Sequence, residues 1–364
     1  MLFSCYKNIT VIGGGNIGTQ VACVCASKGY DVTVYSSRPE TYDGTLEVVD
    51  ENDKVTVGKI KKVTNCLSEA VSEKDFIFVT YPAFKLKELA DAMLPYIKKN
   101  CVICVMPGTG GAEFAFGSCV HTGAILCGLQ RVPSVARLEK YGKRVRCEGL
   151  RDQLFLGTIP LKEGNSIASF ISSLWNIPCS VLPNYLSVTL TPSNPILHTT
   201  RLRTLFEDYK AGVVYERNPL FYGEWSDKSS ELLINCDWEL QELCHRLDAL
   251  DMSNVRSLKL HYESETIEAM TNKLQSIKSL HDLSSPMRMV PGGWIPDFES
   301  RYFTADFPYG LAIIEELGKI LTAKMPNVCE TMDWYRSVTG NKEHFKFSDY
   351  GISSIEELYN IYKE

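Results

Sequence analysis

The sequence predicts an α/β protein, in which an N-terminal domain with a parallel β-sheet is followed by a mostly α-helical domain. Two patterns carry this prediction: short apolar runs alternate with helical patterns as far as residue 130, and helical spacing dominates beyond residue 183. The length of 364 residues is sufficient for two domains. We therefore expect domains at residues 1–183 and 184–364.

The expected strands of the first domain are short apolar runs that end at glycine, proline or polar residues. They lie at residues 8–13, 31–36, 75–82, 100–108 and 123–129. Helical patterns at residues 16–28 and 83–99 separate some of these runs. Alternation of strands and helices is typical of a parallel sheet with right-handed crossovers, which binds its ligand at the carboxyl ends of the strands.

The pattern changes after the fifth of these strands. Residues 142–149 and 152–160 are predicted to pair as antiparallel strands, and the domain boundary is expected near Pro183. The Pro- and Gly-rich residues 284–300 are interpreted either as a lid over a substrate or as a plain connection.

Helices are expected throughout the second domain. Apolar residues recur at helical spacing in residues 231–247 and 267–277. Ser353 stands three residues before Glu356, which is the spacing of a capping box. The apolar faces of these helices would also permit a homodimer.

Composition excludes several classes of partner and site. The net charge is −6 without a basic stripe, so nucleic acid is not expected as a partner, and no apolar run reaches the roughly 20 residues that span a bilayer. The 13 cysteines are an odd number, and Cys101 and Cys104 lie inside an apolar run, which favours buried strand residues over a redox pair. We expect reduced thiols and a cytoplasmic protein. The 6 scattered histidines lack metal-ligand spacing, so no metal is expected.

A glycine motif follows the first expected strand directly. Gly13, Gly15 and Gly18 form G-x-G-x-x-G where a strand leads into a helix, the context that this dinucleotide-binding motif requires. Gly13 would permit the tight turn, Gly15 the approach of the pyrophosphate, and Gly18 the close packing of helix on strand. The alternative is a glycine-rich turn without a ligand. The remaining residues expected to bind the cofactor are Asn16, Ile17, Tyr81 and Pro82.

The end of the second strand indicates which nicotinamide is used. NAD sites usually place Asp or Glu there, on the ribose 2′-hydroxyl, whereas this chain offers Ser36, Ser37 and Arg38. Hydroxyls and a guanidinium would hold a 2′-phosphate, so we predict that NADP is preferred over NAD. A solvated loop arginine remains the alternative.

Two segments of the second domain could supply the chemistry. In "TPSNPILHTTRLRTL" Ser193 or Asn194 could cap a helix, with His198 about one turn in. In "RYFTADFPYG" Asp306 precedes a proline at an apparent helix start, where a helix cap is the simplest interpretation, and Arg301 could be only a loop charge.

With these motifs the sequence resembles the octopine/nopaline (opine) dehydrogenases. The resemblance extends over roughly residues 10 to 330, through "GGGNIG", "YPAF", "PGTGGAEF", "NPILH" and "RYFTADFPYGL". It implies a Rossmann-type domain, a helical second domain, and NAD(P)-dependent joining of an amino acid to a 2-oxo acid. The chain departs from the family pattern at Ala305, where a glutamate is common, and at residues 128–138.

The resemblance also implies roles for individual residues. His198 would be the general acid/base, Asp306 would orient its ring, and Arg301 would bind a substrate carboxylate. Asn194 would hold a second polar group or cap the helix. Two alternatives are a 2-oxo acid reductase of the ketopantoate reductase type, which would need a lysine that "NYLSVTLTPSNPILH" lacks, and a sensor that binds NADPH without turnover.

Overall fold

The computed structural model describes residues 6–363, which form two compact units. The first unit ends at Thr189 and takes in the chain again from Ile361, and the second unit spans Leu190–Asn360. The first is built on a mostly parallel sheet and the second is largely helical, so the predicted fold class is confirmed.

The main sheet of the first unit has eight strands in the order β12-β11-β8-β7-β6-β1-β2-β5. Neighbouring strands are parallel except β11, which is antiparallel to β8. The strands are β1 (Asn8–Ile12), β2 (Asp31–Tyr35), β5 (Lys62–Thr64), β6 (Phe76–Val79), β7 (Val102–Val105), β8 (Ile125–Leu129), β11 (Leu154–Ile159) and β12 (Cys179–Val181). The strand order reverses between β1 and β6, where a sheet of this kind opens a ligand crevice.

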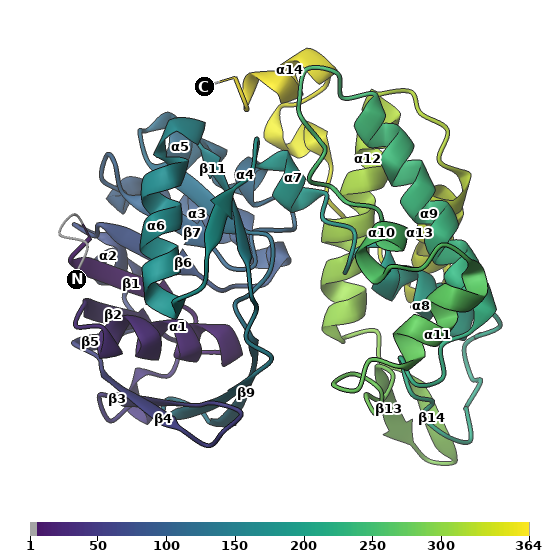
Figure 1. Ribbon diagram of the computed structural model, residues 1–364, viewed down its shortest axis with the longest axis horizontal. Coiled ribbons are helices and arrows are strands. Elements are labelled where there is room, and N and C mark those ends of the chain that lie inside the picture. Colours follow the sequence, from purple (N-terminus) through teal and green to yellow (C-terminus); the bar gives the residue numbers. More distant parts are fainter. Residues whose placement is uncertain (1–5, 364) are drawn as a thin grey trace. The chain divides into compact units, whose positions relative to one another are not determined.

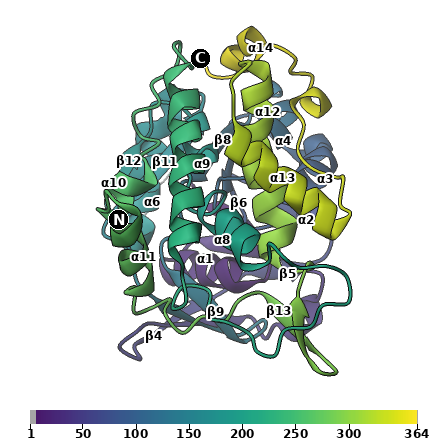
Figure 2. The same cartoon turned by 90° about the vertical axis from the view of Figure 1, so that its right-hand side faces the viewer.

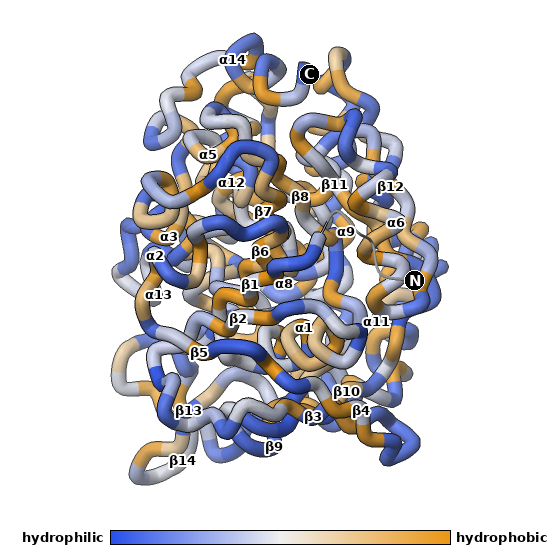
Figure 3. Tube along the Cα trace, turned by 90° about the vertical axis from the view of Figure 1, so that its left-hand side faces the viewer, coloured by the Kyte–Doolittle hydropathy of each residue, from blue (hydrophilic) through white to orange (hydrophobic). Residues whose placement is uncertain are grey.

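Helices cover both faces of this sheet (Figures 1 and 3). One face carries α1 (Asn16–Ser27) and α6 (Gly164–Trp175). The other carries α2 (Leu67–Val71), α3 (Leu86–Met93), α4 (Ala112–Ala115) and α5 (Gly117–His121), and α7 (Leu186–Thr189) ends the unit. Because both faces are covered, β6 and β7 are buried at every position and read as continuous apolar runs. Cys101 and Cys104 are accordingly buried free thiols, as predicted.

A second, smaller sheet lies over α1. Its strands β3 (Thr45–Val49), β4 (Val55–Lys59), β9 (Val135–Lys140) and β10 (Arg144–Glu148) take the order β4-β3-β10-β9. The approach is close, since a Cβ on Gly58 of β4 would lie 2.4 Å from the carbonyl oxygen of Cys23 in α1.

The predicted pairing of residues 142–149 with 152–160 is wrong. These segments are β10, which pairs with β3 and β9, and β11, which pairs with β8 and β12. Burial explains the separation: β10 alternates between buried and half-exposed positions, as suits a sheet with one covered face, whereas β11 is almost wholly buried.

The second unit contains the remaining helices, and Figure 2 shows α8 between α9 and α13. They are α8 (Leu197–Leu205), α9 (Asp227–His245), α10 (Leu258–Tyr262), α11 (Ile267–Gln275), the π-helix η5 (Tyr302–Leu311), α12 (Ala312–Ile320), α13 (Pro326–Thr339) and α14 (Ile355–Asn360). Short 3-10 helices occur in both units. The first unit has η1 (Pro39–Thr41), η2 (Ala83–Lys85), η3 (Leu94–Tyr96) and η4 (Leu161–Glu163), and the second has η6 (Phe347–Tyr350). No helix among residues 6–363 combines the length and the apolar character needed to cross a membrane.

The start of α14 and residues 284–300 differ in detail from what the sequence predicts. The cap of α14 is shifted by one residue: the Ser354 hydroxyl accepts from the amide of Glu357, and the Glu357 carboxylate accepts from the amide of Ser353. Residues 284–300 contain a hairpin of β13 (Met287–Val290) and β14 (Gly293–Pro296). The hairpin is fastened to the unit by paired backbone hydrogen bonds between Tyr215 and Trp294.

Candidate active site

The three motif glycines differ in what surrounds them. Gly13 has φ +113°, which a side chain rarely adopts, and this permits the turn after β1. Gly15 is exposed, and a Cβ placed on it would meet no atom within 4 Å. A Cβ on Gly18 would lie 1.8 Å from the carbonyl oxygen of Gly13. The loop therefore leaves open space at Gly15 and none at Gly18, which fits the approach of a pyrophosphate to the start of α1.

The other predicted cofactor residues surround this loop in different ways. Tyr81 follows β6, and its ring would lie 3.3 Å from a Cβ on Gly13. Pro82 is half-buried beside it and begins the turn into η2. Asn16 uses its side-chain oxygen to accept from the amide of Leu138 in β9. Ile17 packs against the hydrophobic core, so its side chain faces the protein interior.

The end of β2 is tied to the small sheet through Tyr141, which sequence reasoning missed. Ser36 is buried, and its hydroxyl lies 2.9 Å from the hydroxyl of Tyr141 and accepts from the amide of Arg38. The Arg38 guanidinium lies over the Tyr141 ring, 3.8 Å from its centroid. Ser37 and Arg38 are exposed at the crevice edge of the sheet. Arg38 is therefore held by a ring while its charge faces solvent.

In the second unit the structure brings His198 and Asp306 together. Nδ1 of His198 lies 2.8 Å from Oδ2 of Asp306, although 108 positions separate them in the sequence. The two side chains are 15% and 18% exposed, so both are shielded but not sealed from solvent. A carboxylate beside Nδ1 favours the tautomer with the proton on that nitrogen, which leaves Nε2 to other partners.

The cap interpretations of this region are wrong. α8 begins at Leu197, its first turn has no side-chain cap, and Asn194 is exposed, with only its backbone carbonyl accepting from the amide of His198. His198 is thus the second residue of α8. Asp306 lies inside η5, where its carboxylate is directed to the imidazole instead of to backbone amides.

The π-helix η5 explains how Asp306 reaches His198. Pro308 has no amide hydrogen to continue a regular helix, and its carbonyl accepts from the amide of Phe345. A Cβ on Gly310 would lie 3.0 Å from Pro195, so the glycine lets η5 approach the turn before α8. Arg301 is exposed just ahead of η5, and the ring of the next residue, Tyr302, lies 4.7 Å from the His198 ring.

Two further residues of this site were not predicted from the sequence. The hydroxyl of Tyr222 lies 3.4 Å from Nε2 of His198. Arg201, one turn after His198 in α8, is 3% exposed and donates to backbone carbonyls of the segment that carries Tyr222. No pattern in the sequence marks Arg201 as buried, because charged residues at such positions usually face solvent.

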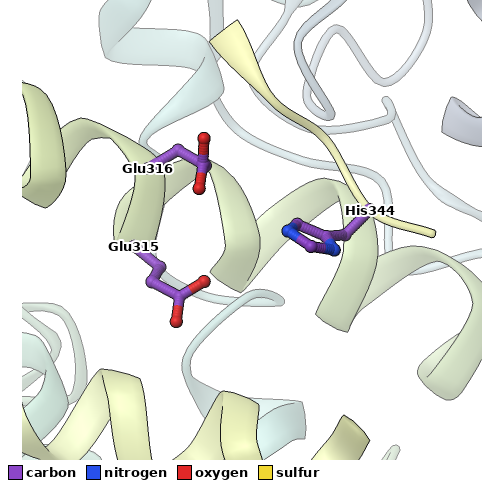
Figure 4. Close-up of side chains that lie close together, drawn as sticks. All are labelled: Glu315, Glu316 and His344. Carbon is purple, nitrogen blue, oxygen red and sulfur yellow. The ribbon is translucent and has the colours of Figure 1, made fainter. Parts of the chain in front are cut away.

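One cluster among residues 6–363 has the composition of a metal site: Glu315, Glu316 and His344 (Figure 4). Its carboxylates are already engaged by cations. Lys319 donates to Glu316 at 2.6 Å, and Arg336 forms an ion pair with Glu315. We interpret the cluster as an ion-pair network that joins α12 to α13.

The first unit holds a buried carboxylate in the segment "PGTGGAEF". Glu113 is 1% exposed and accepts from the hydroxyl of Thr189 at 2.7 Å and from that of Tyr362 at 3.1 Å. Burial raises the pKa of Glu113 to about 7, and the two hydroxyl donors offset only part of this effect. Thr189 is the last residue of the first stretch of this unit, and Tyr362 lies in the C-terminal segment that also belongs to it. Glu113 therefore connects these two parts of the unit.

Stability is therefore expected to depend on pH through Glu113. The folded protein binds the Glu113 proton more tightly than the unfolded chain, so the stability that this group contributes is greatest below about pH 4.5 and is lost as the pH rises to about 7. The loss for this one group is about 3 kcal/mol. In Glu113→Gln the unfolding free energy measured from pH 5 to 8 should fall less steeply than in the wild type. The exposed Glu148→Gln serves as control, and equal slopes for all three proteins would refute the prediction.

Two protein families match separate parts of the chain. Residues 8–112 match the family described as NAD-dependent glycerol-3-phosphate dehydrogenase N-terminus, and residues 181–339 match NAD/NADP octopine/nopaline dehydrogenase, alpha-helical domain. The sheet, the glycine loop and these matches define an NAD(P)-dependent dehydrogenase. Residues 181–339 are thus similar to the helical domain of the octopine/nopaline dehydrogenases.

Individual relatives are similar to this chain over almost its whole length. Tauropine dehydrogenase of Arabella iricolor is 24% identical and covers 95% of this chain and 95% of its own. Opine dehydrogenase of Haliotis discus hannai is 27% identical, with coverages of 98% and 99%. A solved octopine dehydrogenase described with NADH and pyruvate has the same fold, with a TM-score of 0.84 at 21% identity over 98% of this chain and 99% of that one.

Proposed function

We propose that this protein uses NADPH to condense an amino acid with a 2-oxo acid such as pyruvate, and that His198 and Asp306 are its acid/base pair. The observation that carries the proposal is the 2.8 Å contact between Nδ1 of His198 and Asp306, formed by two segments that resemble the family's motifs. Relatives named for tauropine, octopine and opine support the reaction type.

The residues present fit this chemistry in distinct roles. The amine and the oxo acid condense to an imine, and a bound nicotinamide supplies hydride to it. Asp306 fixes the tautomer of His198 and stabilises its cationic form, so that Nε2 can give and take the reaction's proton. Arg301, exposed beside Tyr302, binds a substrate carboxylate through its planar guanidinium. Asn194, exposed before α8, remains a candidate for a second polar contact.

One assay separates this function from its two rivals. The protein is mixed with NADPH and pyruvate, with and without a panel of amino acids, and NADPH oxidation is followed by absorbance. Oxidation that requires an amine supports the proposal. Oxidation with pyruvate alone indicates a 2-oxo acid reductase, and NADPH binding without oxidation indicates a sensor.

Cofactor preference gives a separate prediction. Arg38→Asp places a carboxylate where we propose that the 2′-phosphate binds, so the ratio of kcat/KM for NADPH over NADH should fall about 10- to 100-fold. The prediction rests on the exposed guanidinium that Tyr141 holds at the end of β2. Lys28→Asp makes the same charge change at the opposite end of α1 and should leave the ratio unchanged. An unaltered ratio in Arg38→Asp would show that Arg38 does not contact the cofactor.

A further inference from the structure

The proposed acid/base pair has a third member on the side that faces away from Asp306. Asp306 occupies Nδ1 of His198, and the hydroxyl of Tyr222 lies 3.4 Å from Nε2. Tyr222 is 6% exposed, and its ring stacks on Trp225 at 6.1 Å. The ring is therefore fixed by packing, and its hydroxyl stands beside the nitrogen that exchanges protons.

Arg201 holds the segment that presents Tyr222. Its guanidinium donates to the carbonyls of Phe221 at 2.9 Å, Leu220 at 3.2 Å and Glu224 at 2.8 Å. Desolvation lowers the pKa of Arg201 to about 10, which still leaves it charged at neutral pH. A buried guanidinium that uses its donors on backbone carbonyls fixes a loop to a helix. One helix thus supplies both His198 and the anchor for the residue beside it.

The carboxylate of Glu224 makes further contacts within the same segment. It accepts from the amide of Leu220 at 2.8 Å and pairs with the guanidinium of Arg217. These contacts hold the pKa of Glu224 at about 2, so the carboxylate is ionised at any working pH. The segment is therefore held at both ends by charged hydrogen bonds.

We propose that Tyr222 relays the proton between His198 and the substrate, and that Arg201 is the positioning residue for this relay; the proposal rests on the proposed function. When His198 is protonated, Nε2–H donates to the Tyr222 oxygen, and the phenolic O–H is free to donate to a ligand. Burial raises the pKa of Tyr222 well above its ordinary value, so the phenol stays protonated and able to donate.

The step served is the loss of water from the carbinolamine that the amine and the oxo acid form. Tyr222 gives its proton to the departing hydroxyl, and His198 returns a proton from Nε2 to the phenol oxygen. The C–O bond breaks, the nitrogen lone pair forms the C=N bond, and water leaves. The products are an iminium ion, neutral His198 and unchanged Tyr222, and the iminium carbon is then ready to accept hydride.

Tyr222→Phe tests the relay because it removes the hydroxyl and keeps the ring. We expect kcat to fall about 10- to 100-fold. The NADPH dissociation constant and the melting temperature should stay at wild-type values, and the pH of half-maximal kcat should move. Tyr215→Phe removes the same hydroxyl from a ring that stacks on Tyr209, so it is the matched control and should behave as wild type.

Arg201→Lys tests the positioning role through a double-mutant cycle. Lysine keeps the charge but cannot hold all three carbonyls, so kcat should fall, and the double variant Arg201→Lys/Tyr222→Phe should be no slower than Tyr222→Phe alone. If Arg201→Lys does not fold, Glu224→Gln loosens the same segment and takes its place in the cycle. Multiplicative losses would overturn the positioning role.

The outcomes separate this proposal from the proposed function. Wild-type turnover that requires an amine, together with an equally active Tyr222→Phe, would overturn the relay and leave the function standing. A wild-type protein without amine-dependent turnover would overturn both. A slowed Tyr222→Phe whose pH profile and NADPH affinity match our expectations would support the relay.

Discussion

His198→Ala is expected to reduce amine-dependent NADPH oxidation by about 10²- to 10⁴-fold, the usual contribution of a positioned acid/base group. The physical reason is the fixed imidazole, whose Nδ1 contacts Asp306 and whose Nε2 faces the hydroxyl of Tyr222, the relay that we propose. The glycine loop lies in the other unit, so the NADPH dissociation constant should be nearly unchanged. Steady-state kinetics and a fluorescence titration with NADPH measure the two quantities.

The matched control for this prediction is His281→Ala. His281 is also a histidine of the second unit beside an aspartate, with Nδ1 2.8 Å from Asp282, but it is half-exposed on the surface. Its removal should leave kcat and NADPH affinity unchanged. A large loss of NADPH binding in His198→Ala, or retained turnover, would contradict the role that we assign to His198.

The main sheet could be predicted because its signals are local. β6 and β7 are buried on both faces and appear in the sequence as unbroken apolar runs that stop at proline or glycine. The small sheet over α1 could not be predicted in this way. Its pairing of β3 with β10 joins segments almost 100 positions apart, and a half-buried strand does not indicate which partner it will take.

The candidate site shows the same limit at the level of side chains. The glycine motif is local, and the turn at Gly13, the open space at Gly15 and the close packing at Gly18 are those that its spacing predicts. A polar side chain near a helix start can bind either the backbone amides of the helix or a side chain from elsewhere in the fold. Asp306 contacts the imidazole of His198, which lies 108 positions away in the sequence. Three residues could not be predicted from their spacing in the sequence, because their contacts are with other segments of the chain: Tyr141, Tyr222 and Arg201.

Gly18→Ala is expected to have the largest effect on the cofactor domain. The added Cβ would lie 1.8 Å from the carbonyl oxygen of Gly13 and 2.9 Å from the hydroxyl of Thr80, and backbone cannot yield as a flexible side chain can. α1 must therefore move away from β1, which should cost about 1–3 kcal/mol of stability. Because the start of α1 moves with it, NADPH binding should weaken beyond the measurable range in the same titration.

Gly15→Ala separates packing from ligand approach, because its Cβ would meet no protein atom within 4 Å and its φ of −78° suits alanine. We expect the melting temperature of Gly15→Ala to match the wild type while its NADPH affinity falls, since the methyl group occupies space that the pyrophosphate needs. The two variants add the same methyl group at two positions of one glycine motif. If Gly15→Ala bound NADPH normally, the open space at Gly15 would not be where the cofactor lies, and the loss in Gly18→Ala would reflect unfolding alone.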